Sequence, residues 1–171
     1  MKKNSPRLYA LLKFLVKFNL LAIPLYLVLA LNVNIVELQL ATAQIVEWLL
    51  HLSAVPAVRD GLLITVPVSG GFWAAEIVWD CIGWKSMLFF LALVFATDAP
   101  MKKKRTALLF LPLIVLVNIA RIWFLLYYVA TFGLAHYALL HAVLWSWGLL
   151  LTVIVFWLIW LRYARNKARN A

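Results

Sequence analysis

The stretch Trp79-Asp80-Cys81-Ile82-Gly83-Trp84-Lys85-Ser86 holds the only cysteine of the chain and opens one of several long apolar segments. A single cysteine excludes an intramolecular disulfide. On the membrane topology that the charges indicate, this thiol faces the oxidising, extracytoplasmic side, where an unpaired thiol is a liability. The position of Cys81 therefore points to a thiol that the protein uses chemically.

The composition indicates an integral membrane protein. Of the 171 residues, 67% are hydrophobic and 13% are charged, and the mean hydropathy is +0.98. A soluble domain of this size could not hide so much apolar surface in one core. We therefore expect an all-α polytopic membrane protein that forms one domain over residues 1–171.

The net charge of +10 does not indicate a nucleic-acid-binding protein, because the basic residues gather in blocks that flank apolar runs. Such blocks are typical of cytoplasmic loops and ends. The blocks comprise Lys2, Lys3, Arg7, Lys13 and Lys17, then Lys102, Lys103, Lys104 and Arg105, and finally Arg162, Arg165, Lys167 and Arg169. Most acidic residues fall between the first two blocks, so we expect residues 32–80 on the opposite side of the membrane.

Four apolar segments predict full transmembrane helices, because each is long enough for a hydrocarbon core of about 30 Å. They cover residues 8–31, 81–97, 106–128 and 138–161, which leaves both termini in the cytoplasm. A cleaved signal peptide is an alternative for the first segment. That segment is long, however, and no Ala-x-Ala cleavage site follows directly after it.

The residues between the first two spans predict an outer subdomain that shapes a substrate entrance. Residues 34–51 predict an amphipathic helix, because their polar side chains collect on one side. A full crossing there would turn the Lys102 block outward, so we expect this helix on the outer face. Residues 59–79 hold two short apolar runs around Pro67-Val68-Ser69-Gly70-Gly71, which predicts a short extracytoplasmic β-hairpin.

Three polar residues on separate helices are predicted to lie in one outer-leaflet layer. Cys81 is at the outer end of the second span. At 1.5 Å per residue, Arg121 is roughly 22 Å from the inner end of the third span, and His141 is about 5 Å deep in the last span. A charge inside a span costs roughly 2.5 to 3.5 kcal/mol, so an intramembrane arginine indicates a function.

These three side chains have complementary chemistry. A thiolate is a nucleophile, and cationic neighbours lower its pKa. His141 can exchange protons near neutral pH, and Arg121 offers fixed donors to an oxyanion. Together they predict acyl transfer through a thioester. Each also has a structural interpretation: a packing cysteine, an arginine paired with Glu76 or Asp80, and a histidine bonded to a neighbouring helix.

Other polar residues are candidates for supporting or substrate-binding roles. Asn118 lies one turn before Arg121 and could orient it or the substrate. Lys85 lies one turn inside Cys81, where it could depress the pKa of the thiol or extend to the membrane surface. Asp80 could hold Arg121 or the histidine.

The histidines leave one alternative open and indicate no metal site. His136 competes with His141 for the acid/base role, although it falls in the predicted loop between the last two spans. His51 belongs to the polar face of its predicted surface helix. Because His51, His136 and His141 lack the spacing of zinc ligands, we predict neither a metal nor a cofactor.

Three motifs occur in an order that resembles the exosortase/archaeosortase family of polytopic membrane cysteine enzymes. They are Asp80-Cys81-Ile82-Gly83-Trp84-Lys85-Ser86, then Asn118-Ile119-Ala120-Arg121, then His141 with Trp145 four residues on. The resemblance covers roughly residues 60–160. Ile82 departs from the small or hydroxylated residue expected between the cysteine and the glycine, which bears on the subfamily.

The resemblance implies cleavage of a carboxy-terminal sorting signal made of a short motif, an apolar helix and a basic cluster. It implies Cys81 as nucleophile, Arg121 as stabiliser of the oxyanion or substrate, and His141 as general acid/base. The new carboxyl end would pass to a membrane lipid or another surface acceptor, and water as acceptor would make the protein a protease. Rival hypotheses are a transport or scaffold module with an Arg/His-lined pathway, and an enzyme on lipid phosphates.

Overall fold

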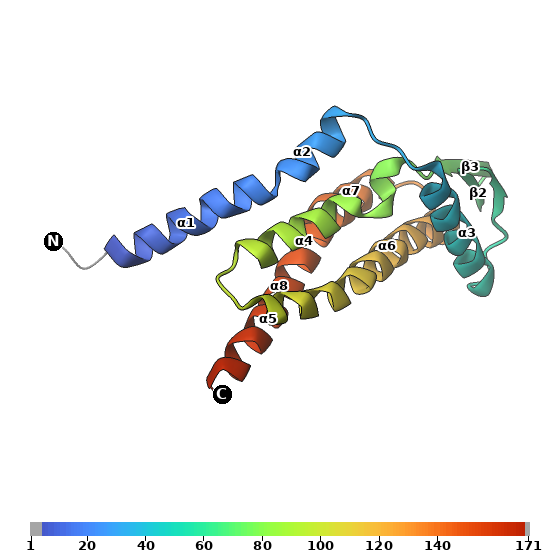
Figure 1. The fold of residues 1–171 in the computed structure, drawn as a ribbon. Helices are drawn as coiled ribbons and strands as arrows, with labels where there is room; N and C mark the ends of the chain where they lie inside the picture. Colours follow the sequence, from blue (N-terminus) through green and yellow to red (C-terminus); the bar gives the residue numbers. More distant parts are fainter. Residues whose placement is uncertain (1–4, 170–171) are drawn as a thin grey trace. The chain divides into compact units, whose positions relative to one another are not determined.

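The computed structural model describes residues 5–169, with the backbone alone at residues 5–7, 146 and 166–169. Lys2 and Lys3 of the first basic block lie outside the described residues. The chain is mostly helical (Figure 1). Its elements in order are α1 (Ser5–Leu21), α2 (Ile23–Ala30), α3 (Val36–Leu52), β1 (Val58–Asp60), β2 (Leu63–Val68), β3 (Gly71–Glu76), η1 (Trp79–Ile82), α4 (Trp84–Ala96), α5 (Met101–Thr106), η2 (Ala107–Leu109), α6 (Phe110–Phe132), α7 (Tyr137–Ala142), η3 (Val143–Gly148) and α8 (Leu149–Arg169).

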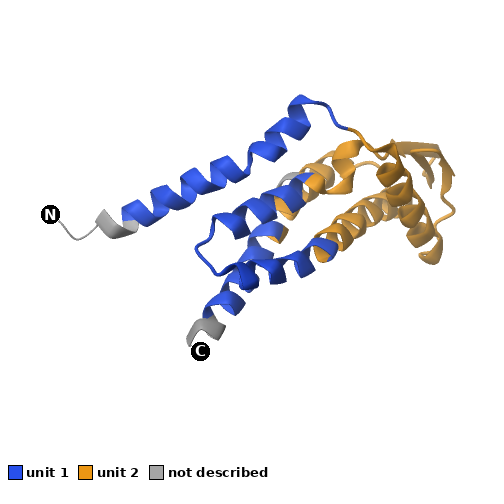
Figure 2. Cartoon of the chain, in the orientation of Figure 1, with its two compact units in different colours: residues 1–33, 85–112, 153–171 blue, residues 34–84, 113–152 orange. Residues whose placement is uncertain are grey.

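The chain divides into two compact units, which Figure 2 colours separately. Unit 1 comprises residues 1–33, 85–112 and 153–171, and unit 2 comprises residues 34–84 and 113–152. Each unit is therefore built from segments that are far apart in the sequence. Helices α6 and α8 contribute residues to both units.

Within residues 5–169, three helical segments are long and apolar enough to cross a membrane, as expected for a polytopic membrane protein. They are Leu8–Ala30, Met101–Phe132 and Tyr137–Arg165. Helix α4 is apolar but has only 13 residues, which at 1.5 Å per residue is about 20 Å, less than a hydrocarbon core of about 30 Å. It begins at Trp84 because Gly83 has a left-handed conformation with φ of 85°. The fourth predicted span, residues 81–97, is therefore not confirmed.

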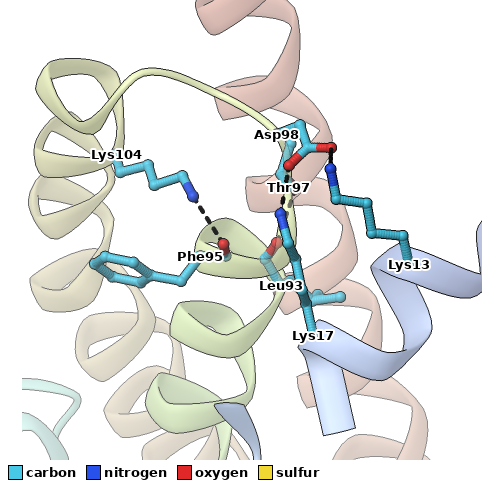
Figure 3. A network of polar contacts seen from close by, with 7 residues as sticks. All are labelled: Lys13, Lys17, Leu93, Phe95, Thr97, Asp98 and Lys104. Atoms are coloured by element: carbon cyan, nitrogen blue, oxygen red, sulfur yellow. Dashed lines mark hydrogen bonds and ion pairs between the residues drawn. The ribbon is translucent and has the colours of Figure 1, made fainter. Parts of the chain in front are cut away.

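In unit 1, Asp98 joins the start of the chain to the end of α4 (Figure 3). Lys17 Nζ lies 2.6 Å from Asp98 Oδ1, and Lys13 Nζ lies 3.5 Å from Oδ2. These lysines are one helical turn apart and share one face of α1. The hydrogen bond from Lys17 and the charges of both lysines hold the pKa of the Asp98 carboxyl below its usual value. Lys104 Nζ donates to the backbone oxygen of Phe95 at 2.8 Å.

Two tryptophans of α8 anchor that helix within unit 1. Trp157 Nε1 donates to Thr97 Oγ1 at 3.1 Å, and Trp160 Nε1 donates to the backbone oxygen of Lys103 at 3.1 Å. Trp160 is fully buried. Each indole therefore combines a large apolar contact with a satisfied N–H, as buried tryptophans generally do.

Unit 2 contains an antiparallel sheet with strand order β1-β2-β3. Strands β2 and β3 pair with Val66 opposite Trp73 and Val68 opposite Gly71. Gly70 lies in the connecting turn with φ of 94°, a conformation that favours glycine. The pair falls within the segment for which the sequence predicted a hairpin, and its extracytoplasmic location stays a prediction.

Helix α3 packs one side against the sheet and against η1 in unit 2. Its buried side includes Gln39 and Val46, and Glu47 accepts a 2.8 Å hydrogen bond from Arg59 Nε of β1. The helix corresponds to the one predicted over residues 34–51, and its location on a membrane face stays a prediction. The core of the unit comprises Ala43, Val46, Leu50, Val55, Ala57, Ile64, Val66, Ile77, Ile119, Ile122, Leu126 and Val129.

Candidate active site

Cys81 lies in η1, the short 3₁₀ helix between β3 and α4. Its backbone N–H donates to the carbonyl of Val78 at 2.8 Å. Gly83 follows in the left-handed region, and a Cβ added there would lie 3.0 Å from Cγ of Asn118. A side chain at position 83 would therefore be strained and would push Asn118 away. The glycine allows α6 to approach the backbone that carries the thiol.

Asn118 holds this backbone from α6. Its side chain is fully buried, and Nδ2 donates a hydrogen bond to the carbonyl oxygen of Cys81. Its Oδ1 atom is buried and has no hydrogen-bond partner among the described atoms. Asn118 thus contacts the main chain at Cys81, whereas its spacing in the sequence suggested a contact with Arg121 or with substrate.

Arg121 follows on the same helix and stacks on an aromatic ring. Its Cζ atom lies 4.7 Å from the ring centroid of Trp145, a cation–π distance. Its Nη1 atom is buried, with no hydrogen-bond partner in the part of the chain that the structure describes. A buried donor without a partner is costly unless a ligand satisfies it. Arg121 is therefore fixed by stacking and keeps a free donor.

His141 is held between two aromatic rings. Its ring stacks on Tyr137 at 5.5 Å and on Trp145 at 5.6 Å, with interplanar angles of 26° and 25°. The three residues are spaced by one helical turn, which places them on one face. The stack runs from α7 into η3, a π-helical turn, and such turns often occur at functional sites. Trp73 of β3 meets Tyr137 edge-on at 4.9 Å.

One cavity of unit 2 brings the predicted site residues together. Cys81, Arg121 and His141 all line it, and its volume is about 70 Å³. Glu76 and Tyr137 also line it, and its walls are otherwise mainly apolar. The cavity thus brings together a thiol, a guanidinium and an imidazole, the groups that acyl transfer through a thioester could use.

The surroundings of Cys81 disfavour its thiolate. Burial raises the pKa of the thiol above its ordinary value, a hydrogen bond to the backbone at Val78 and the charge of Arg121 partly offset this, and the negative charges of Asp80 and Glu76 raise it further. A raised pKa leaves the thiol protonated at neutral pH. Asp80 therefore opposes ionisation of Cys81.

Three other residues singled out in the sequence, Lys85, His136 and His51, do not line this cavity. Lys85 is the second residue of α4 and belongs to unit 1, so its influence on the thiol stays a prediction. His136 is exposed, and its Nδ1 lies 3.3 Å from the hydroxyl of Tyr128. His51 Nε2 lies 2.7 Å from the carbonyl oxygen of Ala57. No three His, Cys, Asp or Glu side chains within residues 5–169 are grouped to hold a metal ion.

Two residues near the thiol were not identified from the sequence. Tyr137 begins the run of residues at four-residue spacing that continues with His141 and Trp145, and this spacing was a usable signal. Gln39 is buried, and its Nε2 donates to the carbonyl of Ile77 at 2.9 Å, between β3 and η1. Gln39 and Ile77 are 38 residues apart in the sequence, so no local sequence pattern predicts their hydrogen bond.

One known family matches most of the chain. A sequence model described as transmembrane exosortase (Exosortase_EpsH) matches residues 5–161. The match includes Cys81, Arg121 and His141 and extends beyond residues 60–160, where the motifs lie. No curated protein and no solved structure gives a match. Because the family match spans most of its length, the chain belongs to the transmembrane exosortase family.

Proposed function

We propose that this protein is a membrane-embedded cysteine transpeptidase or protease that cleaves the carboxy-terminal sorting signal of surface proteins. The observation that carries the proposal is the single cavity lined by Cys81, Arg121 and His141. Membership of the exosortase family supports a transpeptidase. The roles of the three side chains follow from their chemistry.

In the first half-reaction, neutral His141 takes the proton of Cys81 Sγ, because the raised pKa of the thiol leaves little thiolate at rest. The sulfur attacks the carbonyl carbon of the scissile peptide bond. The carbonyl oxygen becomes negative and accepts a hydrogen bond from Nη1 of Arg121, which has no partner among the described atoms. The carbon–nitrogen bond then breaks, and His141 protonates the leaving amine.

In the second half-reaction, an acceptor attacks the thioester on Cys81. The acceptor loses a proton to His141, its nucleophilic atom bonds to the acyl carbon, and the carbon–sulfur bond breaks. The thiol regains its proton, and the enzyme returns to its starting state. A membrane lipid or another surface acceptor gives transpeptidation, and water gives hydrolysis.

The partners in this proposal are proteins with a tripartite tail of short motif, apolar helix and basic cluster, and a lipid as acceptor. Both termini of the enzyme lie in the cytoplasm, and the active site opens toward the extracytoplasmic face. The charge blocks support this orientation, because basic residues concentrate on the cytoplasmic side of membrane proteins. In this proposal each proton transfer uses His141, and no step uses a cofactor or metal.

Co-expression with a reporter protein that carries such a tail tests the proposal. The wild type is compared with Cys81→Ala and with Cys81→Ser, which keeps nearly the same shape but lacks the nucleophilic thiol. We expect the wild type to remove the tail, and both variants to leave it intact. Intact-mass spectrometry measures tail loss and any mass added by the acceptor. Equal removal by wild type and Cys81→Ala would refute the nucleophile assignment.

A further inference from the structure

Strand β3 leaves one of its edges unpaired. The sheet order β1-β2-β3 places β3 at the end, where β2 pairs with it along one side. Within residues 5–169, no fourth strand lies along the other side. An edge strand presents a row of N–H and C=O groups that can pair with another extended chain. The outer edge of β3 therefore has backbone N–H and C=O groups that no strand of the described residues pairs.

The register identifies the groups on this edge. Ile77 N–H donates to the carbonyl of Leu62 at 2.9 Å, so position 77 turns its N–H toward β2. Because the pattern alternates in an antiparallel pair, Phe72 and Ala74 turn their N–H and C=O groups away from β2. Pro67, opposite Phe72 in β2, fits this alternation, since it has no N–H to offer β3.

The side chains at this edge are open to contact. Phe72 is 80% exposed although it is a large apolar residue, and Ala74 and Glu76 are also exposed. By contrast, Ile64 and Val66 on the neighbouring strand β2 are fully buried in the core of the unit. The side chains of Phe72, Ala74 and Glu76 on the solvent face of β3 are therefore exposed, whereas the inner face of the sheet is packed.

The same strand continues into the candidate active site. Trp73, Ala75 and Ile77 alternate along it and line the cavity that Cys81 also lines. Gln39 fixes the connection to η1 through its hydrogen bond to Ile77. A chain lying along β3 would thus be guided toward the thiol.

We propose that the free edge of β3 binds an extended segment of the substrate polypeptide, which adds to the sheet as a fourth strand. This inference rests on the proposed function. Main-chain hydrogen bonds supply affinity for any sequence, and alternate side chains of the bound segment face the cavity and supply selectivity. The bound segment is the part of the substrate that is to be cut, because β3 leads into the cavity that Cys81 lines.

Removal of the Ala74 N–H, which points away from β2, tests whether β3 forms main-chain hydrogen bonds with the substrate. Ala74→Pro deletes an N–H that the pairing with β2 does not use, and edge strands tolerate proline. Ala74→Val is the matched control, because it keeps the N–H and suits a strand. We expect Ala74→Pro to raise KM for the tailed reporter roughly fivefold with little change in kcat, as loss of one hydrogen bond predicts. An unchanged KM, with Cys81 alkylated at the wild-type rate, would overturn the proposal.

Photo-crosslinking separates this proposal from the catalytic one. Benzoylphenylalanine replaces Phe72 in the Cys81→Ala background, so binding is read without turnover. The control position is Val58 on β1, which lies at the opposite end of the sheet and is 68% exposed. We expect the tailed reporter to crosslink at position 72 and not at position 58.

Each other outcome has a defined meaning. Equal crosslinking at both positions, or crosslinking at position 72 to a second copy of the enzyme, would overturn the binding edge. If wild-type enzyme fails to cut a reporter that crosslinks at position 72, the proposed catalytic function fails and the binding edge stands. If cutting is normal and position 72 does not crosslink, the binding edge fails and the catalytic function stands.

Discussion

The two units differ in how they satisfy their polar side chains. In unit 1, Trp157 and Trp160 donate to acceptors of the same unit, and Lys17 is paired with Asp98. In the described part of unit 1, no buried side-chain nitrogen or oxygen lacks a hydrogen-bond partner. These contacts are complete without any ligand, which suits a unit that anchors the protein.

Unit 2 instead contains buried polar atoms without partners among the described residues. They are Gln39 Oε1, Trp79 Nε1, Asn118 Oδ1 and Arg121 Nη1. Each such atom costs about 1–3 kcal/mol if it stays unsatisfied. Asn118 and Gln39 also hold the backbone on either side of η1. The buried donors and acceptors that remain open to a bound molecule are therefore in unit 2, the unit that contains Cys81.

The largest effect expected after loss of Cys81 itself is that of His141→Ala. Loss of a general acid/base should slow tail removal by roughly 10²- to 10⁴-fold. His136→Ala is the matched control in the same unit, because His136 is exposed and bonds Tyr128 instead of lining the cavity. Initial rates of reporter processing measure both. A larger loss from His136→Ala would reverse the assignment of the acid/base.

Arg121→Lys tests whether shape as well as charge matters in unit 2. Lysine keeps the positive charge but lacks the planar group that stacks on Trp145 and the fixed donors of arginine. We expect the rate of tail removal to fall roughly 10²- to 10³-fold, as for loss of an oxyanion donor. Near-wild-type processing by Arg121→Lys would show that a positive charge alone suffices.

Alkylation of Cys81 reports its ionisation without any substrate. Because burial and nearby carboxylates raise the pKa of the thiol, its alkylation rate should still increase with pH above the ordinary thiol pKa of about 8.5. Glu76→Gln removes a charge that raises this pKa, so at a fixed pH near neutrality it should speed alkylation severalfold. The rate of adduct formation is followed by mass spectrometry. Slower alkylation in Glu76→Gln would contradict the sign of this electrostatic effect.

The smallest effect is expected in unit 1, from Asp98→Asn. The carboxylate is exposed and its pairs with Lys13 and Lys17 are solvated, so such pairs contribute little. We expect unchanged tail removal and an unchanged thermal unfolding midpoint. A loss of processing as large as that of Arg121→Lys would remove the functional distinction between the units.

Local sequence patterns predicted the helices better than the contacts between them. The one-sided polar residues located α3, and apolar runs with basic blocks located α6 and most of α8, since these patterns depend on residues near one another in the sequence. The start of α4 was placed too early, because the left-handed turn at Gly83 ends η1 before the helix begins. The described residues therefore contain three candidate spans, and the fourth predicted span is not confirmed.

The candidate site was predictable in its members but not in its geometry. Cys81, Arg121 and His141 line one cavity, while their common depth in the membrane stays a prediction and their catalytic roles stay proposals. The bond from Asn118 to Cys81 could not be derived from spacing, because it depends on the close approach that Gly83 allows. The division into two units likewise depends on packing between distant segments.

Trapping the acyl-enzyme is the most direct test of thioester chemistry at Cys81. Wild type and Cys81→Ala are mixed with the tailed reporter, quenched in acid during turnover, and analysed by peptide mass spectrometry before and after hydroxylamine treatment. The expected result is an adduct on Cys81 with the mass of the reporter lacking its tail, which hydroxylamine releases as a hydroxamate and which Cys81→Ala never forms. Tail removal without this adduct, at equal rates in both proteins, would contradict the mechanism.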